Sequence, residues 1–403
     1  MQNLSFFKGI RNLLYSNFFS LLFQFFFTFL LIKSLSLTEL GKFSFSLSLL
    51  SIIIHILSFG IRQSITIQLK KNNGLISIII NNIIFHITCI SAISFFGYLL
   101  INYFFIIAES DLYLLGLSFI LLSIIFSQIN GIYLGLNMYD NYTINNLSVH
   151  FSKIIILLVI NHFIIITSKI ALIILILSHI AFLIFSFINL SSYHSKNWEV
   201  DLRLYNKMIR SGFIYGANLF LIGLIYSGDI ILLKFYVSDS DIGSYHIASK
   251  LISFICIIPQ SIGMYFFSKN SLINIDKKNN SIISIIKYSI YFCIIIIISI
   301  IFSSGAIINA LFDQSDFKIA ITIIALSPGL IGLFLIKIIY PLLARNKPPV
   351  KYFIPFFISV LFNLALNVIL IPYFSIFGAA LASAITYSTL GLFIYYKFIY
   401  LIK

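Results

Sequence analysis

Long apolar runs separated by short polar clusters follow one another along the whole chain. Runs of about 18 or more nearly uncharged residues are long enough to cross ~30 Å of hydrocarbon as helices. They are continuously apolar, whereas the strands of an outer-membrane barrel alternate apolar and polar positions. The pattern predicts an all-α polytopic membrane protein of about twelve spans, at residues 13–32, 43–61, 76–106, 112–134, 144–166, 170–190, 211–236, 242–266, 282–310, 319–343, 350–371 and 376–398.

Composition excludes the soluble classes. Of the 403 residues, 60% are hydrophobic and 9% are charged, against about 25% charged in soluble domains. The mean hydropathy is +1.06, and too few polar residues remain to cover a water-exposed surface. In a soluble protein, a net charge of +14 would indicate binding to nucleic acid. In a membrane protein, the positions of the positive charges instead indicate which side of the membrane each loop faces. No nucleic-acid partner is predicted.

The Lys and Arg residues are unevenly divided between the two sides of the membrane. With the N-terminus inside, 18 of the 26 fall on the inner side. Five fall on the outer side, namely Lys33, Lys42, Lys169, Lys234 and Lys318. By the positive-inside rule, both termini are expected in the cytoplasm.

Six predicted spans lie on each side of a polar mid-chain segment. This divides the chain into an N-terminal six-helix lobe (1–190), a cytoplasmic interfacial linker (191–210) and a C-terminal six-helix lobe (211–403). Because six is even, both halves start on the same membrane face, which makes them parallel repeats. Pro259, Pro328, Pro341 and Pro355 fall in or near spans of the second half and predict kinks there, which serve either gating or ordinary kinked packing.

Short matching segments support the repeat. Ile10-Arg11-Asn12 precedes the first span as Ile209-Arg210-Ser211 precedes the seventh. Thr38 to Phe43 parallels Ser240 to Tyr245, each with an acidic residue two positions before a glycine and an aromatic residue two positions after it. The distance from Arg to Gly differs by three residues between the halves, so the alignment needs a gap.

Ionisable residues inside spans are candidate functional residues, because each is costly in hydrocarbon unless paired or hydrated. Asp229 is the one acid deep in a predicted span. With the connecting loop centred at 239–240, Lys250 lies at a similar depth on the next helix and could pair with it. His246 is one turn from Lys250 on the same face. Either these residues line a hydrated pathway, or they form a structural buried pair.

Further pathway candidates lie in other spans. Lys153 and His150 form a polar stripe with Asn146, and Gln24 belongs to a polar face of the first span. Such stripes either line a pathway or hold helices together. Lys337 is close enough to the inner interface to snorkel there. The candidate cationic route consists of three lysines within spans and three arginines at its cytoplasmic end. These are Lys153, Lys250, Lys337, Arg11, Arg62 and Arg210.

Nothing in the sequence indicates catalysis. It has no Walker A loop, no G-x-S-x-G and no HExxH motif. The three cysteines show no metal-site spacing and are expected to be buried, so no cofactor is predicted. Single histidines are expected to be packed or hydrogen-bonded, and these are His55, His86, His162 and His179.

An ordered set of features resembles a known family. It comprises Thr38 to Phe43, Asp229, the segment Ile242 to Leu251, Pro259 and the segment Asn363 to Ala384, NLALNVILIPYFSIFGAALASA. The arrangement resembles the O-antigen repeat-unit flippases, which belong to the MATE-like multidrug/oligosaccharidyl-lipid/polysaccharide exporter superfamily. Residues 160–171 of the first half lack the Pro and Gly-Ala-Ala of the second, so roles cannot be transferred between the halves there.

The resemblance implies two six-helix lobes and alternating access. The implied substrate is an undecaprenyl-diphosphate-linked oligosaccharide, carried from the cytoplasmic to the periplasmic leaflet of a bacterial inner membrane. The lipid bilayer, a polysaccharide polymerase and a chain-length regulator are the other implied partners. Coupling to H⁺ or Na⁺ is left open, with Asp229 as the ion-responsive candidate. The alternatives are a multidrug exporter of the same superfamily and, third, a membrane polysaccharide polymerase.

Overall fold

The structure is a computed structural model that describes residues 2–104, 110–193, 199–268, 280–312, 317–343 and 350–402. All regular elements in these ranges are helices, as the sequence predicts. Contacts divide the chain into two compact units. The first contains Met1–Ser34 and Ser46–Gly223, and the second contains Leu35–Phe45 and Leu224–Lys403.

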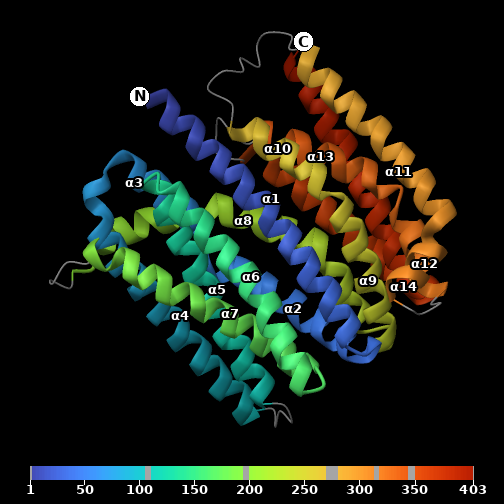
Figure 1. The fold of residues 1–403 in the computed structure, drawn as a ribbon, viewed down its shortest axis with the longest axis horizontal. Helices are drawn as coiled ribbons and strands as arrows, with labels where there is room; N and C mark the ends of the chain where they lie inside the picture. Colours follow the sequence, from blue (N-terminus) through green and yellow to red (C-terminus); the bar gives the residue numbers. More distant parts are fainter. Residues whose placement is uncertain are drawn as a thin grey trace. The chain divides into compact units, whose positions relative to one another are not determined.

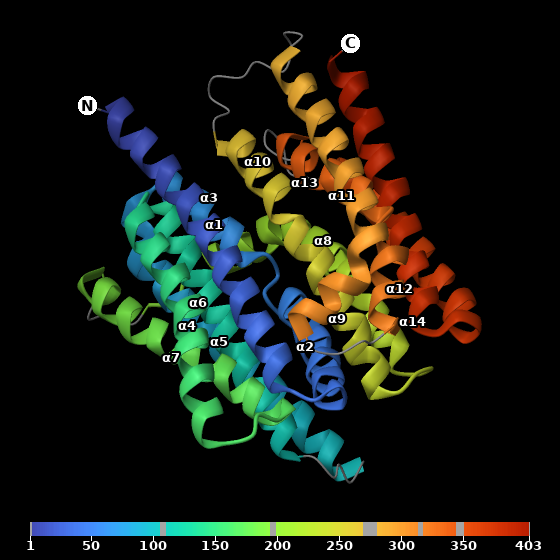
Figure 2. The same cartoon turned by 45° about the vertical axis from the view of Figure 1, so that its right-hand side comes forward.

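The first unit is built from the helices of the N-terminal half. In order these are α1 (Gln2–Ser34), most of α2 (Leu37–Leu57), α3 (Ile61–Lys71), η1 (Asn73–Leu75), α4 (Ile76–Phe104), α5 (Ser110–Gly135), α6 (Tyr139–Phe163), α7 (Ser168–Leu190), η2 (Ser191–Tyr193) and the first part of α8 (Leu202–Leu233). Within this unit α1 runs alongside α6 (Figures 1 and 2). Residues 194–198 of the predicted linker lie outside the described ranges.

The second unit contains the C-terminal helices. They are the rest of α8, α9 (Asp239–Ile255), α10 (Ile257–Ser268), α11 (Asn280–Phe312), α12 (Phe317–Leu326), α13 (Gly329–Leu343) and α14 (Val350–Ile402). The first residues of α2 also pack here, which is why Leu35–Phe45 belongs to this unit.

Nine helices in the described ranges are long and apolar enough to cross a membrane, or eleven spans if two bent pairs are counted. The pairs α9–α10 and α12–α13 are bent by 43° and 53°. Pro259 and Pro328 explain these bends, since proline has no N–H for the carbonyl four residues earlier and its ring clashes with it. The kinks predicted at Pro259 and Pro328 are confirmed, whereas α13 and α14 continue as helices through Pro341 and Pro355.

The twelfth predicted span is the second arm of α14. Ser375 has non-helical backbone angles (φ 54°, ψ −137°), and the chain reverses there. Asn363 donates a hydrogen bond to Thr386, and Gly378 contacts the backbone of Leu370, so the arms run side by side. The arms correspond to the predicted spans 350–371 and 376–398.

Helix α3 was not predicted from the sequence. It is a short amphipathic helix whose apolar face supplies Ile61, Ile65 and Leu69 to the core of the first unit, each 1% exposed or less. The turn before it has positive φ at both Phe59 and Gly60. Helix α8 passes so closely that Gly212 contacts the backbone of this turn. This packing holds the first part of α8 in the first unit, so the boundary between the two contact units falls inside α8, between Gly223 and Leu224.

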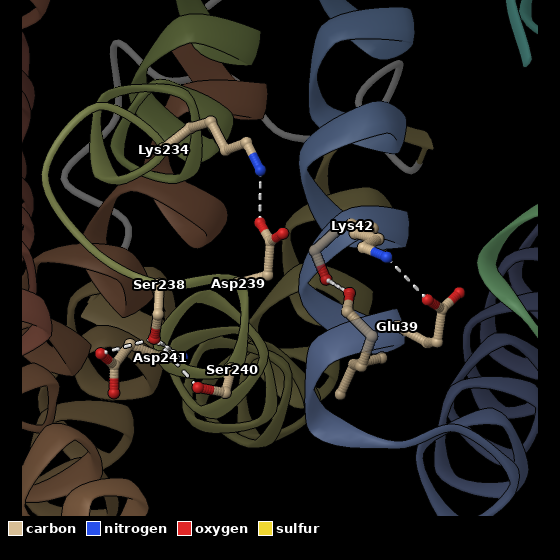
Figure 3. Close-up of polar contacts among 9 residues, drawn as sticks. Glu39, Lys42, Lys234, Ser238, Asp239, Ser240 and Asp241 are labelled. Carbon is tan, nitrogen blue, oxygen red and sulfur yellow. Dashed lines mark hydrogen bonds and ion pairs between the residues drawn. The ribbon is translucent and has the colours of Figure 1, made fainter. Parts of the chain in front are cut away.

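Helices α2 and α9 begin with the same hydrogen-bond pattern, which gives the predicted repeat a structural basis. The backbone N–H of Glu39 donates to Ser36 Oγ, and that of Asp241 donates to Ser238 Oγ, both at 3.3 Å. These are N-caps in which a serine satisfies a free N–H of the first turn. Figure 3 shows Ser238 with Ser240 and Asp241 at the start of α9, and the adjacent ion pairs Lys42–Glu39 and Lys234–Asp239.

The same two helix starts pack against each other through glycine. A Cβ on Gly41 would meet the backbone of Asp239, and a Cβ on Gly243 would meet the backbone of Leu37. In the sequence, residues 239 and 243 each lie 202 positions beyond residues 37 and 41. The contact is therefore reciprocal, and both glycines of the predicted repeat are required for it.

Candidate functional site

Asp229 is a buried acid in the second unit. Its side chain is 1% exposed and accepts hydrogen bonds from three side chains on two other helices. Tyr245 of α9 donates to Oδ2 at 2.8 Å, Asn367 of α14 donates to Oδ1 at 2.8 Å, and Ser383 of α14 also donates to Oδ2. Three donors around one carboxylate compensate a large part of the desolvation that burial imposes on it.

A second layer of polar groups from the two arms of α14 supports this cluster. The Asn367 amide also donates to Asn363 Oδ1 at 3.1 Å, and the Asn363 amide donates to Thr386 Oγ1 at 3.4 Å. Asn367 Oδ1 is buried without a hydrogen-bond partner in the described part of the chain. We call Asp229, Tyr245, Asn363, Asn367, Ser383 and Thr386 the Asp229 cluster.

The predicted pairing of Asp229 with Lys250 is wrong. No ion pair joins them among the described residues, and Tyr245 occupies the place expected for the lysine. The turn runs from Leu233 to Asp239, so its centre lies near residue 236 and not at 239–240. With a rise of about 1.5 Å per residue, Lys250 lies several ångströms deeper along its helix than Asp229.

Lys250 and His246 nevertheless share one face of α9, as predicted. Lys250 is half-buried, and its ammonium has no carboxylate within ion-pair distance in the described ranges. His246 is 3% exposed, and its Nδ1 has no hydrogen-bond partner there. This face of α9 thus carries an uncompensated cation beside an unsatisfied ring nitrogen.

Lys337 of α13 contacts two neutral side chains of the second unit. Its Nζ donates to Gln260 Oε1 at 2.9 Å and lies 5.5 Å from the centre of the Tyr226 ring. Both partners are neutral, so the ammonium keeps its charge uncompensated while gaining a hydrogen bond and a cation–π contact.

In the first unit, an amide network joins α5, α6 and α7. Asn145 donates to Asn130 at 3.0 Å, Asn130 donates to Asn146 at 3.2 Å, and Ser186 donates to Asn145 at 3.4 Å. All four side chains are at most 9% exposed. One end of the predicted stripe, Asn146, therefore holds helices together.

The other end of that stripe has no such partners. Lys153 is half-buried without an ion pair in the described ranges, and His150 Nδ1 is buried and unsatisfied. Arg62 of α3 donates to the Tyr142 hydroxyl at 3.4 Å. Gln24 is exposed on α1.

Three of the four single histidines form hydrogen bonds through a ring nitrogen, as predicted. His55 and His179 hydrogen-bond the backbone one turn earlier in their helices, and His86 bonds Tyr205 and the Leu57 carbonyl. His162 is exposed, with its ring edge-on to Phe163. No group of three or more His, Cys, Asp or Glu side chains in the described ranges could hold a metal ion.

Sequence reasoning missed the residues that surround Asp229. The sequence places Tyr245 in the repeat, and it places Asn363, Asn367 and Ser383 only in the segment that resembles the family. The available signal was the pair of asparagines four residues apart on one arm and the polar pair Ser383 and Thr386, three residues apart, on the other. Both spacings place polar atoms on one helix face.

Comparison with known proteins identifies the family. Residues 6–268, well over half of the chain, match the model of the polysaccharide biosynthesis protein family. The chain belongs to this family. No curated protein matches this polysaccharide biosynthesis protein in sequence.

Solved structures establish the fold class of the protein. The lipid II flippase MurJ in its inward closed conformation superposes with a TM-score of 0.69 at 20% identity, covering 95% of this chain and 86% of that one. A MOP superfamily transporter from Pyrococcus furiosus gives 0.66 at 13% identity, covering 98% and 96%. An inward-facing multidrug resistance MATE family transporter gives 0.69 at 12% identity, covering 94% and 95%.

These likenesses show a fold and leave the substrate open. The protein has the two-lobe helical architecture of MOP superfamily transporters, which confirms the predicted fold class. Beyond the fold, it is a member of the polysaccharide biosynthesis protein family, and several helices in the described ranges are long and apolar enough to cross a membrane.

Proposed function

We propose that the protein moves undecaprenyl-diphosphate-linked O-antigen or polysaccharide repeat units from the cytoplasmic to the periplasmic leaflet of a bacterial inner membrane. Both termini face the cytoplasm in this proposal. The protein works by alternating access and performs no chemistry on its cargo, while a polymerase and a chain-length regulator act after it. The family match to polysaccharide biosynthesis and the fold shared with a lipid II flippase support the proposal.

Uncompensated cations inside the spans are the structural observation that carries the proposal. Lys153 in the first unit and Lys250 in the second are half-buried, and neither has a carboxylate partner among the described residues. Lys337 has only neutral partners. A buried ammonium without a counterion is costly, and an anionic cargo such as a diphosphate would supply that counterion. A cationic drug would instead raise the free-energy cost of burying these ammonium groups.

The Asp229 cluster is the site we propose for a coupling cation, either H⁺ or Na⁺. Its oxygens come from a carboxylate, two amides and three hydroxyls, the hard ligands that small alkali and alkaline-earth cations prefer. Asn367 Oδ1 is buried and unsatisfied, so the cluster has an acceptor available. The residues thus fit such an ion, and Asp229, Asn363, Asn367 and Thr386 would hold it.

The deciding experiment compares a deletion strain with the same strain complemented with the wild-type gene. In the uncomplemented strain, lipid-linked single repeat units should accumulate on the cytoplasmic leaflet, measured by extracting the lipid-linked sugars and testing their accessibility in sealed inner-membrane vesicles. If no such units accumulate and the cells instead lose resistance to cationic drugs, the multidrug-exporter alternative holds. If single units still reach the outer core while long chains vanish, the protein is the polymerase.

Replacing Lys250 tests the cationic route directly. Lys250→Ala is expected to reduce surface polysaccharide at least about tenfold at unchanged protein level, because a buried charge-assisted contact to the cargo is worth roughly 1.5–3 kcal/mol. Lys234→Ala is the matched control, since this lysine lies outside the spans and is paired with Asp239. Equal output from both variants would remove Lys250 from the route. Comparing Lys153→Ala with Lys169→Ala repeats the test in the first unit.

A further inference from the structure

A pocket that is open to the surface lies in the first unit at the shared end of α1 and α6, outside the site described above. It measures about 380 Å³ and is lined by Lys33 and Ser34 at the end of α1 and by residues 161–166 at the end of α6 and in the following turn. This is within the size range of small-molecule sites, about 300–1,000 Å³. We call it the α1–α6 cavity.

The polar groups of the cavity favour an anion. Lys33, Asn161 and His162 line it, and no carboxylate does. The Lys33 ammonium lies 5.0 Å from the centre of the Phe29 ring and has no ion-pair partner among the described residues. An ammonium, an amide NH₂ and an imidazole N–H are the donors that a phosphate group accepts from.

The exposed apolar side chains that line the cavity indicate that it faces the bilayer. Phe163, Ile164 and Ile165 are consecutive and are 77%, 57% and 85% exposed. They connect two candidate spans, Tyr139–Phe163 and Ser168–Leu190, where a turn in water would use polar turn residues. Three adjacent apolar side chains at the end of a span instead indicate insertion at the level of the lipid headgroups.

From these observations we infer that the α1–α6 cavity binds the phosphate of a bilayer lipid. Lys33, Asn161 and His162 hold the phosphate, and the lipid chains lie against Phe163 and Ile165. The inference does not depend on the cargo proposed above, since it concerns a resident lipid at the edge of the first unit.

Native mass spectrometry of the purified, delipidated full-length protein tests this site. The probes are phosphatidylglycerol, diacylglycerol with the same chains but no phosphate, and inorganic phosphate. We expect one phosphatidylglycerol molecule to bind more tightly than any further phosphatidylglycerol molecules. Diacylglycerol should not compete with this tightly bound molecule. Lys33→Gln should weaken this binding about fivefold, the size expected for one lysine near an anionic headgroup.

Lys169→Gln is the matched control, because Lys169 is exposed near the same end of the unit but does not line the cavity. It should leave the tight phosphatidylglycerol unchanged, and Ile165→Ser should weaken it. Equal binding of phosphatidylglycerol and diacylglycerol would overturn the inference, as would equal losses from Lys33→Gln and Lys169→Gln. Displacement of the lipid by millimolar inorganic phosphate would assign the cavity to free phosphate and also overturn it.

Discussion

Replacement of Asp229 by asparagine or alanine is expected to abolish export of surface polysaccharide while the protein remains in the membrane. Asparagine keeps the shape of the side chain, and its oxygen can still accept from Asn367, while the hydroxyls of Tyr245 and Ser383 can accept from its amide. The packing of the cluster should therefore survive, but the charge that we propose to bind a cation is removed. The measurement is surface polysaccharide per unit of membrane-inserted protein.

Two further variants test whether the loss of export is specific to Asp229 and its hydrogen-bond donors. Asp241→Asn is the matched control, because Asp241 is at a helix start, where it pairs with Lys318, and such exposed pairs contribute about 0–1 kcal/mol. Its output should be near that of the wild type. Tyr245→Phe removes one donor and should lower output only partly. Wild-type output from Asp229→Asn and Asp229→Ala would show that Asp229 takes no part in transport.

The second large effect is expected where α2 and α9 cross. Gly41→Ala and Gly243→Ala should both sharply lower the yield of folded protein, because in each case the new Cβ meets backbone atoms of the other helix. A backbone carbonyl cannot move aside as a flexible side chain can, so the cost should exceed the ~1–3 kcal/mol of ordinary overpacking. The measurement is the thermal unfolding midpoint in detergent, read by size-exclusion chromatography after heating.

Gly305→Ala is the control for that experiment. Gly305 lies inside α11, and nothing is within 4 Å of the Cβ it would gain. Alanine there should be neutral or should stabilise the helix by roughly 0.5–1 kcal/mol. A thermal midpoint for Gly41→Ala as high as that of Gly305→Ala would contradict the close crossing.

The apolar pattern predicted the spans well, because membrane crossing depends on length and hydropathy, which are local properties. It also predicted the bends at Pro259 and Pro328, where the cause lies in a single residue. Helix α3 escaped prediction because it is a short amphipathic helix between spans. Its stability comes from packing Ile61, Ile65 and Leu69 into the core.

The Asp229 cluster could be predicted only in part. Asp229 could be identified from the sequence, because a carboxyl group inside a span needs a partner or hydration wherever it lies. Its partners depend on the register between helices, which the turn after Leu233 sets. An error of a few residues in the turn centre was enough to replace Tyr245 by Lys250 as the expected partner. The arms of α14 meet through a reversal at Ser375 that hydropathy does not reveal.

The reciprocal glycine contact has a consequence for how such a chain can arise. Each of the segments 37–41 and 239–243 supplies both the glycine and the backbone that the other glycine needs. That is the geometry of an isologous interface, in which one surface is complementary to a second copy of itself. A shorter chain carrying a single copy of this segment could make the same contact with another molecule of its own kind. After the halves are joined in one chain, neither glycine can be lost without disturbing the other half.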